Sequence, residues 1–512
     1  MEKSNLKLKI PGIILFAILT INVLIALFGV LSVTFVNSTD EACYGINAYE
    51  MLKNGNIWVN TLKYKTDYYN SKPPLMLWLI LIGYKIYGCN AMGLRIASAV
   101  CGLFLFFIGS YFVYRKKDGV SALLFAAFLP ACTLLFNYHM MRSGDTDSLY
   151  GLCFILAMIG LINASQNPMW LVLYGLSFGL GFMTKSTHAA LIIIIGILCI
   201  PFLVRYGAKI RHIVFSALAA VLVILPWFIA RVGYDGLDFI KVMVFGETIA
   251  NATTSSQNAA FTEYFSYIVQ FAREPICDIS FAIIIIAVVV RFISGAGRDD
   301  GKGRIVSFIK EIIDYRRYVL IVWFIVVVGA FSAVKARLEW YIYVSYIPLV
   351  MMAAECGAYL VKTIYRRKKT VLAVMLFMLM ISAALAISVV NTSKYPWNGT
   401  GGNPKVNLGN DLEVLRDNAE IATSGRTAYI ETPYNDYKPQ NCWELDCVFY
   451  LEAITDMKCM DGGAPEFLAT DDMDAVLIID KSLWDQYSDV LTGYVILQDN
   501  NYLIFSKHKY GE

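Results

Sequence analysis

Long apolar runs with almost no charged residues recur through the first 390 positions of this 512-residue chain, and they limit its fold more than any other feature. Hydrophobic residues make up 57% of the chain and charged residues 16%, and the mean hydropathy is +0.56. One soluble core cannot bury that much apolar surface, whereas runs of this length match the hydrocarbon thickness of a bilayer. The sequence therefore predicts an α-helical polytopic membrane protein.

Eleven of these runs are interpreted as membrane spans. They are residues 10–36, 91–114, 120–138, 148–163, 169–183, 187–204, 210–232, 277–293, 318–334, 340–361 and 371–390. The first run has no small-residue cleavage site before Asp40, so we interpret it as an anchor rather than a signal peptide. Residues 73–88 form a further run, but its sixteen residues rise only about 24 Å as a helix, against a hydrocarbon core of about 30 Å. We expect an interfacial or re-entrant helix there.

Basic residues collect in alternate loops between the predicted spans. The clusters lie at 115–117, 205–211, 291–317 and 366–369, and the amino terminus is also basic. The positive-inside rule assigns such loops to the cytoplasm. Loop 37–90, loop 233–276 and everything after residue 390 then face the exterior, which predicts a multi-pass protein of the cytoplasmic membrane. The net charge of +3 is too small to indicate a nucleic-acid partner.

The composition changes abruptly after the last predicted span. Residues 391–512 are rich in Asp, Asn, Gly and Tyr, and the short apolar runs 475–479 and 494–497 are typical of buried strands. We therefore divide the chain into a membrane domain, 1–390, and a small soluble extracytoplasmic α/β domain, 391–512. Cys442, Cys447 and Cys459 lie in this tail, where an exported domain could form a disulfide, although an odd number leaves one thiol over.

Several cations lie at the predicted outer ends of spans, against the general trend. They are Lys72, Arg142, Lys185, Lys335 and Arg337. Cations at headgroup depth are suited to binding an anion there, and a lipid phosphate is the anion available at that depth. The alternative is that they extend to ordinary headgroups or pair with Asp145 and Asp147.

Two adjacent carboxylates, Asp40 and Glu41, open the first external loop. One interpretation is an N-cap for a helix over 42–53, since Asp is a good cap. A second, compatible interpretation is catalytic, because a carboxylate facing a hydroxyl nucleophile can act as general base. The required leaving group is a stable anion, and a lipid phosphate held by cations meets that requirement. The implied reaction is glycosyl transfer from a phospholipid carrier.

Five motifs in this order resemble the GT-C glycosyltransferases, and most of all the aminoarabinose transferase of lipid A modification and its relatives, with the protein O-mannosyltransferases more distant. The motifs are Asp40-Glu41-x-x-Tyr44, Tyr69-x-x-Lys72-Pro73-Pro74-Leu75, Arg142-x-x-x-x-Asp147, Thr184-Lys185 and Trp340-Tyr341 followed by Pro348. The resemblance covers roughly residues 10–360 and implies the GT-C fold. The tail matches only as an exported soluble domain after the spans.

The resemblance also implies roles for individual residues. Asp40 would be the catalytic base or would orient the acceptor. The substrate-binding residues would be Glu41, Tyr44, Tyr69, Lys72, Arg142, Asp145, Asp147, Lys185, Arg337 and Tyr341. Among these, Asp147 would support the first external loop. The sequence departs from the family pattern at Cys43, where the aminoarabinose transferases have Arg, and at Tyr343, where Pro is common.

These observations predict a glycosyltransferase that moves a sugar from a polyprenyl-phosphate donor to a glycan, lipid or protein acceptor at the outer face of the membrane. A single carboxylate acting as base predicts inversion at the anomeric carbon. We expect no obligatory metal, although Asp40 and Glu41 could recruit a divalent cation. The alternatives are a lipid-linked-sugar flippase or transporter, which should bury charge near mid-membrane, and a polysaccharide polymerase.

Overall fold

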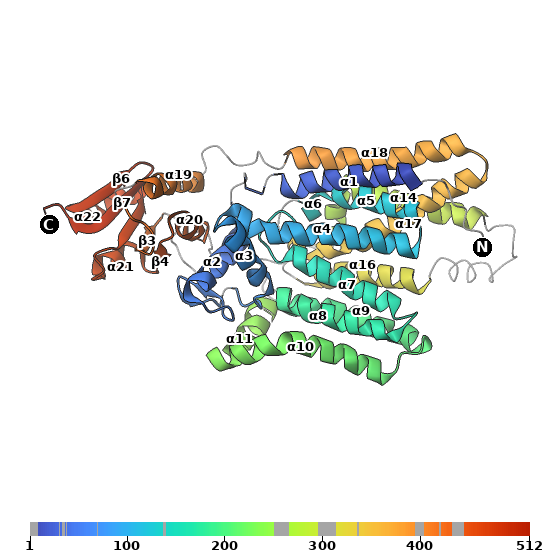
Figure 1. Cartoon of the computed structure of the whole chain (residues 1–512), viewed down its shortest axis with the longest axis horizontal. Helices are drawn as coiled ribbons and strands as arrows, with labels where there is room; N and C mark the ends of the chain where they lie inside the picture. Colours follow the sequence, from blue (N-terminus) through green and yellow to red (C-terminus); the bar gives the residue numbers. More distant parts are fainter. Residues whose placement is uncertain are drawn as a thin grey trace. The chain divides into compact units, whose positions relative to one another are not determined.

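A computed structural model describes residues 9–29, 31–32, 36, 38–68, 70–136, 140–249, 266–294, 314–334, 337–394, 404–418, 421–432 and 445–511. The chain divides into two compact units (Figure 1). The first comprises residues 1–30, 98–142 and 146–395, and the second comprises 31–97, 143–145 and 396–512. The division falls within one helix, α4, because its first turns belong to the second unit.

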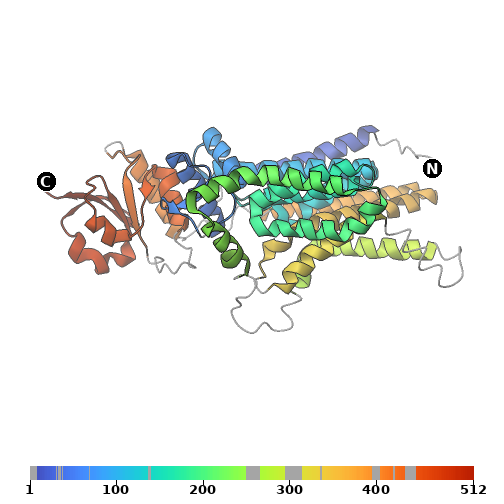
Figure 2. The same ribbon diagram turned by 90° about the horizontal axis from the view of Figure 1, so that it is seen from below.

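The first unit is a bundle of long helices whose axes run side by side (Figures 1 and 2). Its principal helices are α1 (Lys9–Phe28), α4 (Ala91–Lys116), α5 (Gly119–Phe128), α7 (Asp147–Asn163), α8 (Leu171–Lys185), α9 (Ala190–Arg205), α10 (Ile210–Asp235), α14 (Pro275–Ser294), α16 (Tyr315–Ala333), α17 (Tyr343–Arg366) and α18 (Thr370–Lys394). Shorter pieces are η1 (Leu129–Ala131), α6 (Thr133–Phe136), η2 (Pro168–Trp170), η3 (Ser186–Ala189), α11 (Asp238–Lys241), η4 (Val242–Ile249), α13 (Ser266–Ala272) and η6 (Glu339–Ile342).

Small residues bring some of these helices into close contact. A Cβ added at Gly175 of α8 would lie 1.9 Å from the Ser216 carbonyl oxygen of α10, and one at Gly179 would lie 2.9 Å from that of Ala220. Such small-residue contacts are typical of helix pairs in membranes, where dispersion replaces the hydrophobic effect as the force between helices.

Each of the eleven predicted spans contains a helix, but the bounds differ, since α1 ends at Phe28 whereas the first predicted span ends at residue 36. In the described residues, eight helical segments are long and apolar enough to cross a membrane, and one of them, Pro168–Arg205, contains two predicted spans. This segment consists of two helices, α8 and α9, that pack against each other. The Tyr174 hydroxyl of α8 donates a 2.7 Å hydrogen bond to the Ile192 carbonyl of α9. The predicted spans 120–138 and 148–163 correspond to the shorter apolar helices Gly119–Ala131 and Asp147–Asn163.

The second unit begins with the loop after α1. It contains α2 (Thr39–Asn54), the hairpin β1 (Thr61–Leu62) and β2 (Lys65–Thr66), and α3 (Leu75–Tyr87). The helix α3 is the predicted interfacial helix, and its 13 residues span only about 20 Å. It packs on α2, where the Tyr84 hydroxyl donates to the Gly45 carbonyl at 3.1 Å. The predicted short helix in this loop is therefore present, and its position at the membrane surface stays a prediction.

The tail forms an α/β fold around a five-stranded sheet of order β4-β3-β5-β7-β6. Its elements are α19 (Pro404–Asp417), β3 (Thr427–Glu431), α20 (Leu445–Thr455), β4 (Lys458–Cys459), α21 (Gly463–Ala469), β5 (Val476–Asp480), η9 (Lys481–Leu483), α22 (Trp484–Leu491), β6 (Tyr494–Asp499) and β7 (Tyr502–Lys509). The strands β3, β4 and β5 pair in parallel, and β7 runs antiparallel between β5 and β6. Both predicted strands, 475–479 and 494–497, are present.

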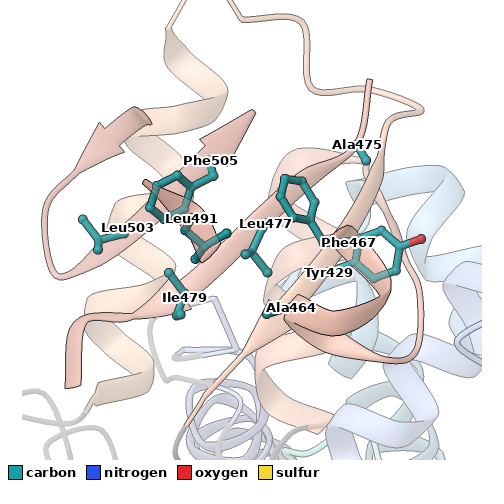
Figure 3. Packing of buried hydrophobic residues seen from close by; sticks show 9 residues of the cluster. All are labelled: Tyr429, Ala464, Phe467, Ala475, Leu477, Ile479, Leu491, Leu503 and Phe505. Atoms are coloured by element: carbon teal, nitrogen blue, oxygen red, sulfur yellow. The ribbon is translucent and has the colours of Figure 1, made fainter. Parts of the chain in front are cut away.

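One apolar core holds this fold together (Figure 3). Leu477 and Ile479 of β5 lie beside Leu503 and Phe505 of β7, and Phe467 comes from α21. The alternating positions on these strands point to one face of the sheet, as the period of two requires. Cys447 and Cys459 are buried in the second unit. Cys442 lies outside the described residues, so the disulfide stays a prediction, as does the domain boundary at residue 390.

Candidate active site

The helix α2 carries the predicted catalytic acid on its first turn. The helix begins at Thr39 with Ser38, in extended conformation, as its N-cap, and the Ala42 amide donates to the Ser38 carbonyl at 2.9 Å. The N-cap interpretation of Asp40 was therefore wrong by two positions, because the helix starts earlier than expected. Within the first turn, the carboxylate of Asp40 is still favoured by the positive end of the helix dipole.

Glu41, predicted to bind substrate, has both carboxylate oxygens occupied by protein groups. Arg95 donates to it from Nε at 2.6 Å and from a terminal nitrogen at 2.9 Å, and the Gly144 amide donates at 2.8 Å. Both Glu41 and Arg95 are 2% exposed. Arg95 also donates to the Leu31 carbonyl at 3.0 Å. This bidentate pair therefore ties together three segments of the second unit rather than leaving a carboxylate for a ligand.

Four of the predicted site residues lie close together in the second unit. They are Asp40, Tyr44, Lys72 and Asp145, and the three charged groups all act on the Tyr44 hydroxyl. The Lys72 ammonium lies 5.5 Å from the centroid of the buried Tyr44 ring. Burial raises the pKa of the Tyr44 hydroxyl well above its ordinary value; Lys72 lowers it, and the nearby Asp40 and Asp145 carboxylates raise it. Tyr44 therefore stays protonated and can donate a hydrogen bond. Ser143 donates to Asp145 at 2.6 Å and so orients that carboxylate.

A buried polar network holds the segment that carries Lys72. Asn47 of α2 donates to Asp67 at 2.9 Å and accepts from Asn70 at 2.7 Å. Asn60 donates to the carbonyls of Asn70 and Lys72, at 2.8 and 3.0 Å. The motif residue Tyr69 lies outside the described residues, so its predicted role stays a prediction.

A second group of predicted residues lies within the first unit. The Lys185 ammonium donates to the Asp147 carboxylate, and both side chains are buried. The same ammonium lies 5.9 Å from the ring centroids of Tyr150 and Tyr341. The rings of His188 and Tyr341 are 5.2 Å apart. The structure thus brings Asp147, Lys185 and Tyr341 together, as a cation among a carboxylate and aromatic faces.

Two of the remaining predicted cations, Arg142 and Arg337, lie in the described residues. Arg142 is buried, with 1% exposure, in the first unit. Arg337 donates from Nε to the Ser332 carbonyl at a long 3.4 Å. Lys335 lies outside the described residues.

The structure bears on the divalent cation considered at Asp40 and Glu41. Glu41 is committed to Arg95 and Gly144, so the two carboxylates do not form a ligand pair. Within the described ranges, no group of three or more His, Cys, Asp or Glu side chains is arranged to hold a metal ion.

Sequence reasoning missed Arg95, Asn47 and Asp67. Arg95 had a usable signal, because it is a charged residue inside a predicted span and such residues are seldom without a role. Asn47 follows Asp40 by seven positions, the spacing that repeats a helical face. Nothing in the local sequence of Asp67 distinguishes it from an ordinary loop carboxylate.

Comparisons with known proteins agree with this fold. Residues 71–229 match the family model described as dolichyl-phosphate-mannose-protein mannosyltransferase. That segment includes Lys72, Arg142 and Lys185, whereas Asp40 precedes it. An undecaprenyl phosphate-alpha-4-amino-4-deoxy-L-arabinose arabinosyl transferase of Pseudomonas fluorescens (strain Pf0-1) is 30% identical over 229 residues, which cover 41% of this chain and 37% of that protein. The match thus spans little more than a third of the relative.

Solved structures extend the likeness to the whole chain at the level of fold. ArnT from Cupriavidus metallidurans, crystallised with undecaprenyl phosphate, matches with a TM-score of 0.72 and 13% identity, over 98% of both chains. The oligosaccharyltransferase of Archaeoglobus fulgidus matches with a TM-score of 0.55 and 12% identity, over 100% of this chain and 76% of that one. The whole-chain fold and the matched sequence together confirm the predicted resemblance: this chain is a multi-pass membrane protein with the fold of ArnT, and part of its sequence is similar to the aminoarabinose transferases.

Proposed function

We propose that this protein transfers a sugar from a polyprenyl-phosphate donor to an acceptor hydroxyl, with Asp40 as the general base. The observation that carries the proposal is the grouping of Asp40, Tyr44, Lys72 and Asp145 within one compact unit of a GT-C fold. An acid beside a cation and a protonated phenol provides both a proton acceptor and donors for a phosphate. The names of the relative and of the ArnT structure, both of which include undecaprenyl phosphate, support the choice of donor class.

The proposed step is a direct displacement at the anomeric carbon. The acceptor hydroxyl gives its proton to the Asp40 carboxylate while its oxygen bonds to the anomeric carbon. The bond from that carbon to the phosphate oxygen breaks, and the phosphate leaves on its lipid as an anion. Lys72 and the Tyr44 hydroxyl stabilise this anion, and the single displacement inverts the configuration. Arg142, Lys185, Arg337 and Tyr341 stay proposed substrate ligands.

We also propose that the reaction takes place at the outer face of the cytoplasmic membrane. The distribution of basic loops supports this orientation, because it leaves Asp40 and the tail on the side opposite the basic clusters. A reporter fused after residue 512 should be active only if it is exported. Activity of a cytoplasm-restricted reporter at that position would contradict the orientation.

The decisive experiment compares Asp40→Asn with the wild-type protein in liposomes. The donors are undecaprenyl-phosphate monosaccharides, and the acceptor is envelope material from cells that lack the protein. We expect release of undecaprenyl phosphate, measured by mass spectrometry, to fall about 10²- to 10⁴-fold, the usual worth of a general base. Asp485→Asn is the matched control, because Asp485 is also an acid in a first helical turn but is exposed on α22.

Each outcome of this experiment separates the proposed enzyme from its rivals. Full activity in Asp40→Asn would overturn the role of Asp40. Movement of labelled donor across the liposome membrane without product would favour a flippase. A product that retains the donor's anomeric configuration, seen by NMR, would contradict the single displacement.

A further inference from the structure

A buried polar network connects the helix of Asp40 to the segment of Lys72. Its members are buried, with exposures of 0% for Asn47, 3% for Asp67, 3% for Asn70, 2% for Asn60 and 1% for Cys43. All belong to the second unit. The Asn70 Oδ1 atom makes no hydrogen bond to the described residues, but each hydrogen bond of this network that is broken would leave a further desolvated polar group, and this cost rigidifies the network.

Asn47 is the junction of this network, because its amide nitrogen and its amide oxygen both make hydrogen bonds within it. Its amide nitrogen donates to the Thr61 carbonyl at 2.6 Å and to Asp67 at 2.9 Å. Its amide oxygen accepts from the Asn70 side-chain amide at 2.7 Å and lies 3.8 Å from the Cys43 Sγ, whose single proton can go either to this oxygen or to Asp67. An aspartate here could not donate to Thr61, and an apolar side chain would leave each of these partners without its contact to residue 47.

The junction lies on the helical face that carries the proposed catalytic residues. Positions 40, 43, 44 and 47 are spaced i, i+3, i+4 and i+7, so Asp40, Cys43, Tyr44 and Asn47 share one stripe of α2. The hydrogen bonds of Asn47 therefore fix the position of α2 along its axis and its rotation about that axis, and with them the position of Asp40.

Asp67 holds the other side of the network. One of its oxygens accepts from the Asn70 backbone N–H at 3.1 Å, and the other accepts from the Asn47 side-chain amide at 2.9 Å and lies 3.5 Å from the Cys43 Sγ. Asn60 then holds the carbonyls of Asn70 and Lys72. Burial, together with the Asp67 charge, raises the pKa of the Cys43 thiol well above its ordinary value, so the thiol remains a donor.

We propose that Asn47 and Asp67 are positioning residues that fix the Lys72 ammonium relative to the Asp40 carboxylate, so that one donor phosphate can contact Lys72 while its sugar faces Asp40. This inference rests on the proposed function. The Cys43 thiol is consistent with this positioning role, because it is a small hydrogen-bond donor that lies near both Asn47 and Asp67. Neither residue is assigned contact with the substrate.

The test is a kinetic double-mutant cycle with undecaprenyl-phosphate monosaccharide as donor. Asn47→Ala and Asp67→Asn should each raise the donor KM by at least about tenfold, since a displacement near 1 Å can cost as much as 10²-fold. In a Lys72→Met background the same changes should have little further effect, because the group that they position is gone. Asn54→Ala, seven residues further along α2 and exposed, is the matched control and should match wild type.

A merely structural role gives a different result. It would lower kcat by reducing the active fraction, leave the donor KM unchanged and add fully to Lys72→Met, and that pattern would overturn the proposal. If Asn47→Ala fails to fold by size-exclusion chromatography, the isosteric Asp67→Asn carries the test, with binding of undecaprenyl phosphate alone as a second readout. An inactive wild-type protein would count against the proposed function, whereas an active one with an unchanged KM in both variants would count against positioning only.

Discussion

At the scale of single residues, the ion pair of Glu41 and Arg95 is a buried, bidentate contact in the second unit. Both groups are 2% exposed, and their two hydrogen bonds are accompanied by contacts to the Gly144 amide and the Leu31 carbonyl. Removing one member of such a pair leaves a buried charge without compensation, which typically costs about 3–5 kcal/mol. The pair thereby fixes the start of α2, one residue from Asp40.

We predict that Arg95→Leu lowers the stability of the full-length protein by about 3–5 kcal/mol. The measurement is thermal unfolding in detergent, followed by tryptophan fluorescence. Arg115→Leu is the control, because Arg115 lies on the same helix but is exposed, and it should change stability by less than about 0.5 kcal/mol. The double variant Glu41→Leu with Arg95→Leu should recover part of the loss. If the Arg95→Leu protein unfolds at the same temperature as the wild-type protein, the ion pair does not stabilise the fold.

At the scale of elements, α2 packs tightly on the tail through a glycine. A Cβ added at Gly45 would lie 2.6 Å from the Phe449 ring of α20 and 3.2 Å from the Tyr84 hydroxyl of α3. Gly45 therefore sits in the helix interior for a packing reason, although glycine weakens a helix by up to about 1 kcal/mol. The three helices α2, α3 and α20 meet at this point of the second unit.

Gly45→Ala should destabilise the protein by about 1–2 kcal/mol, because the overpacking cost of about 1–3 kcal/mol exceeds the gain in helix propensity. Gly233→Ala is the matched control, since a Cβ there meets nothing within 4 Å. The same melting measurement applies, and Phe449→Leu should partly restore the stability of Gly45→Ala. Equal melting temperatures for the two alanine variants would show that the ring moves aside without cost.

At the scale of the whole molecule, the loop after the first span and the tail form one folded unit although some 400 residues separate them in sequence. Lys53 contacts Asp456 at 2.5 Å, Tyr49 donates to Asp456 at 2.7 Å, and Lys63 contacts Asp461 at 3.3 Å. Beneath these contacts lie two buried acids, Glu50 of α2 and Glu452 of α20. Burial raises the pKa of both carboxyl groups. The negative charges of Glu50 and Asp456 raise the pKa of Glu452 further.

The buried acids predict that stability falls as pH rises from about 5 to 8. Burial raises the pKa of Glu50 from 4.5 to about 7. The folded state therefore holds this proton more tightly than the unfolded state does. The resulting contribution of Glu50 to the free energy of unfolding is complete below about pH 4.5 and is lost as pH rises through about 7. The size is roughly 3 kcal/mol, since one pKa unit corresponds to about 1.4 kcal/mol. Glu50→Gln should flatten the dependence of melting temperature on pH.

Glu466→Gln is the control for this prediction, because Glu466 is an exposed glutamate of α21 in the same unit. Its melting profile should keep the wild-type slope. A Glu50→Gln protein with that same slope would show that Glu50 is not the group responsible.

Local patterns sufficed to predict the long apolar helices, the short helix α3 and the strands of the tail. These features depend on hydropathy and periodicity within a few tens of residues, which a sequence displays directly. The start of α2 was misplaced by three residues, because Ser38, Thr39 and Asp40 are all competent caps and only backbone geometry chooses among them.

The sequence by itself determined that this chain spans a membrane many times and carries Asp40 and Lys72 in one loop, because composition and motif spacing are local properties. The tertiary structure decided which polar groups pair: Glu41 with Arg95, Asn47 with Asp67, and Lys185 with Asp147. The partners lie 54, 20 and 38 residues apart. Burial makes such pairings strong, and burial exists only once distant segments have packed together.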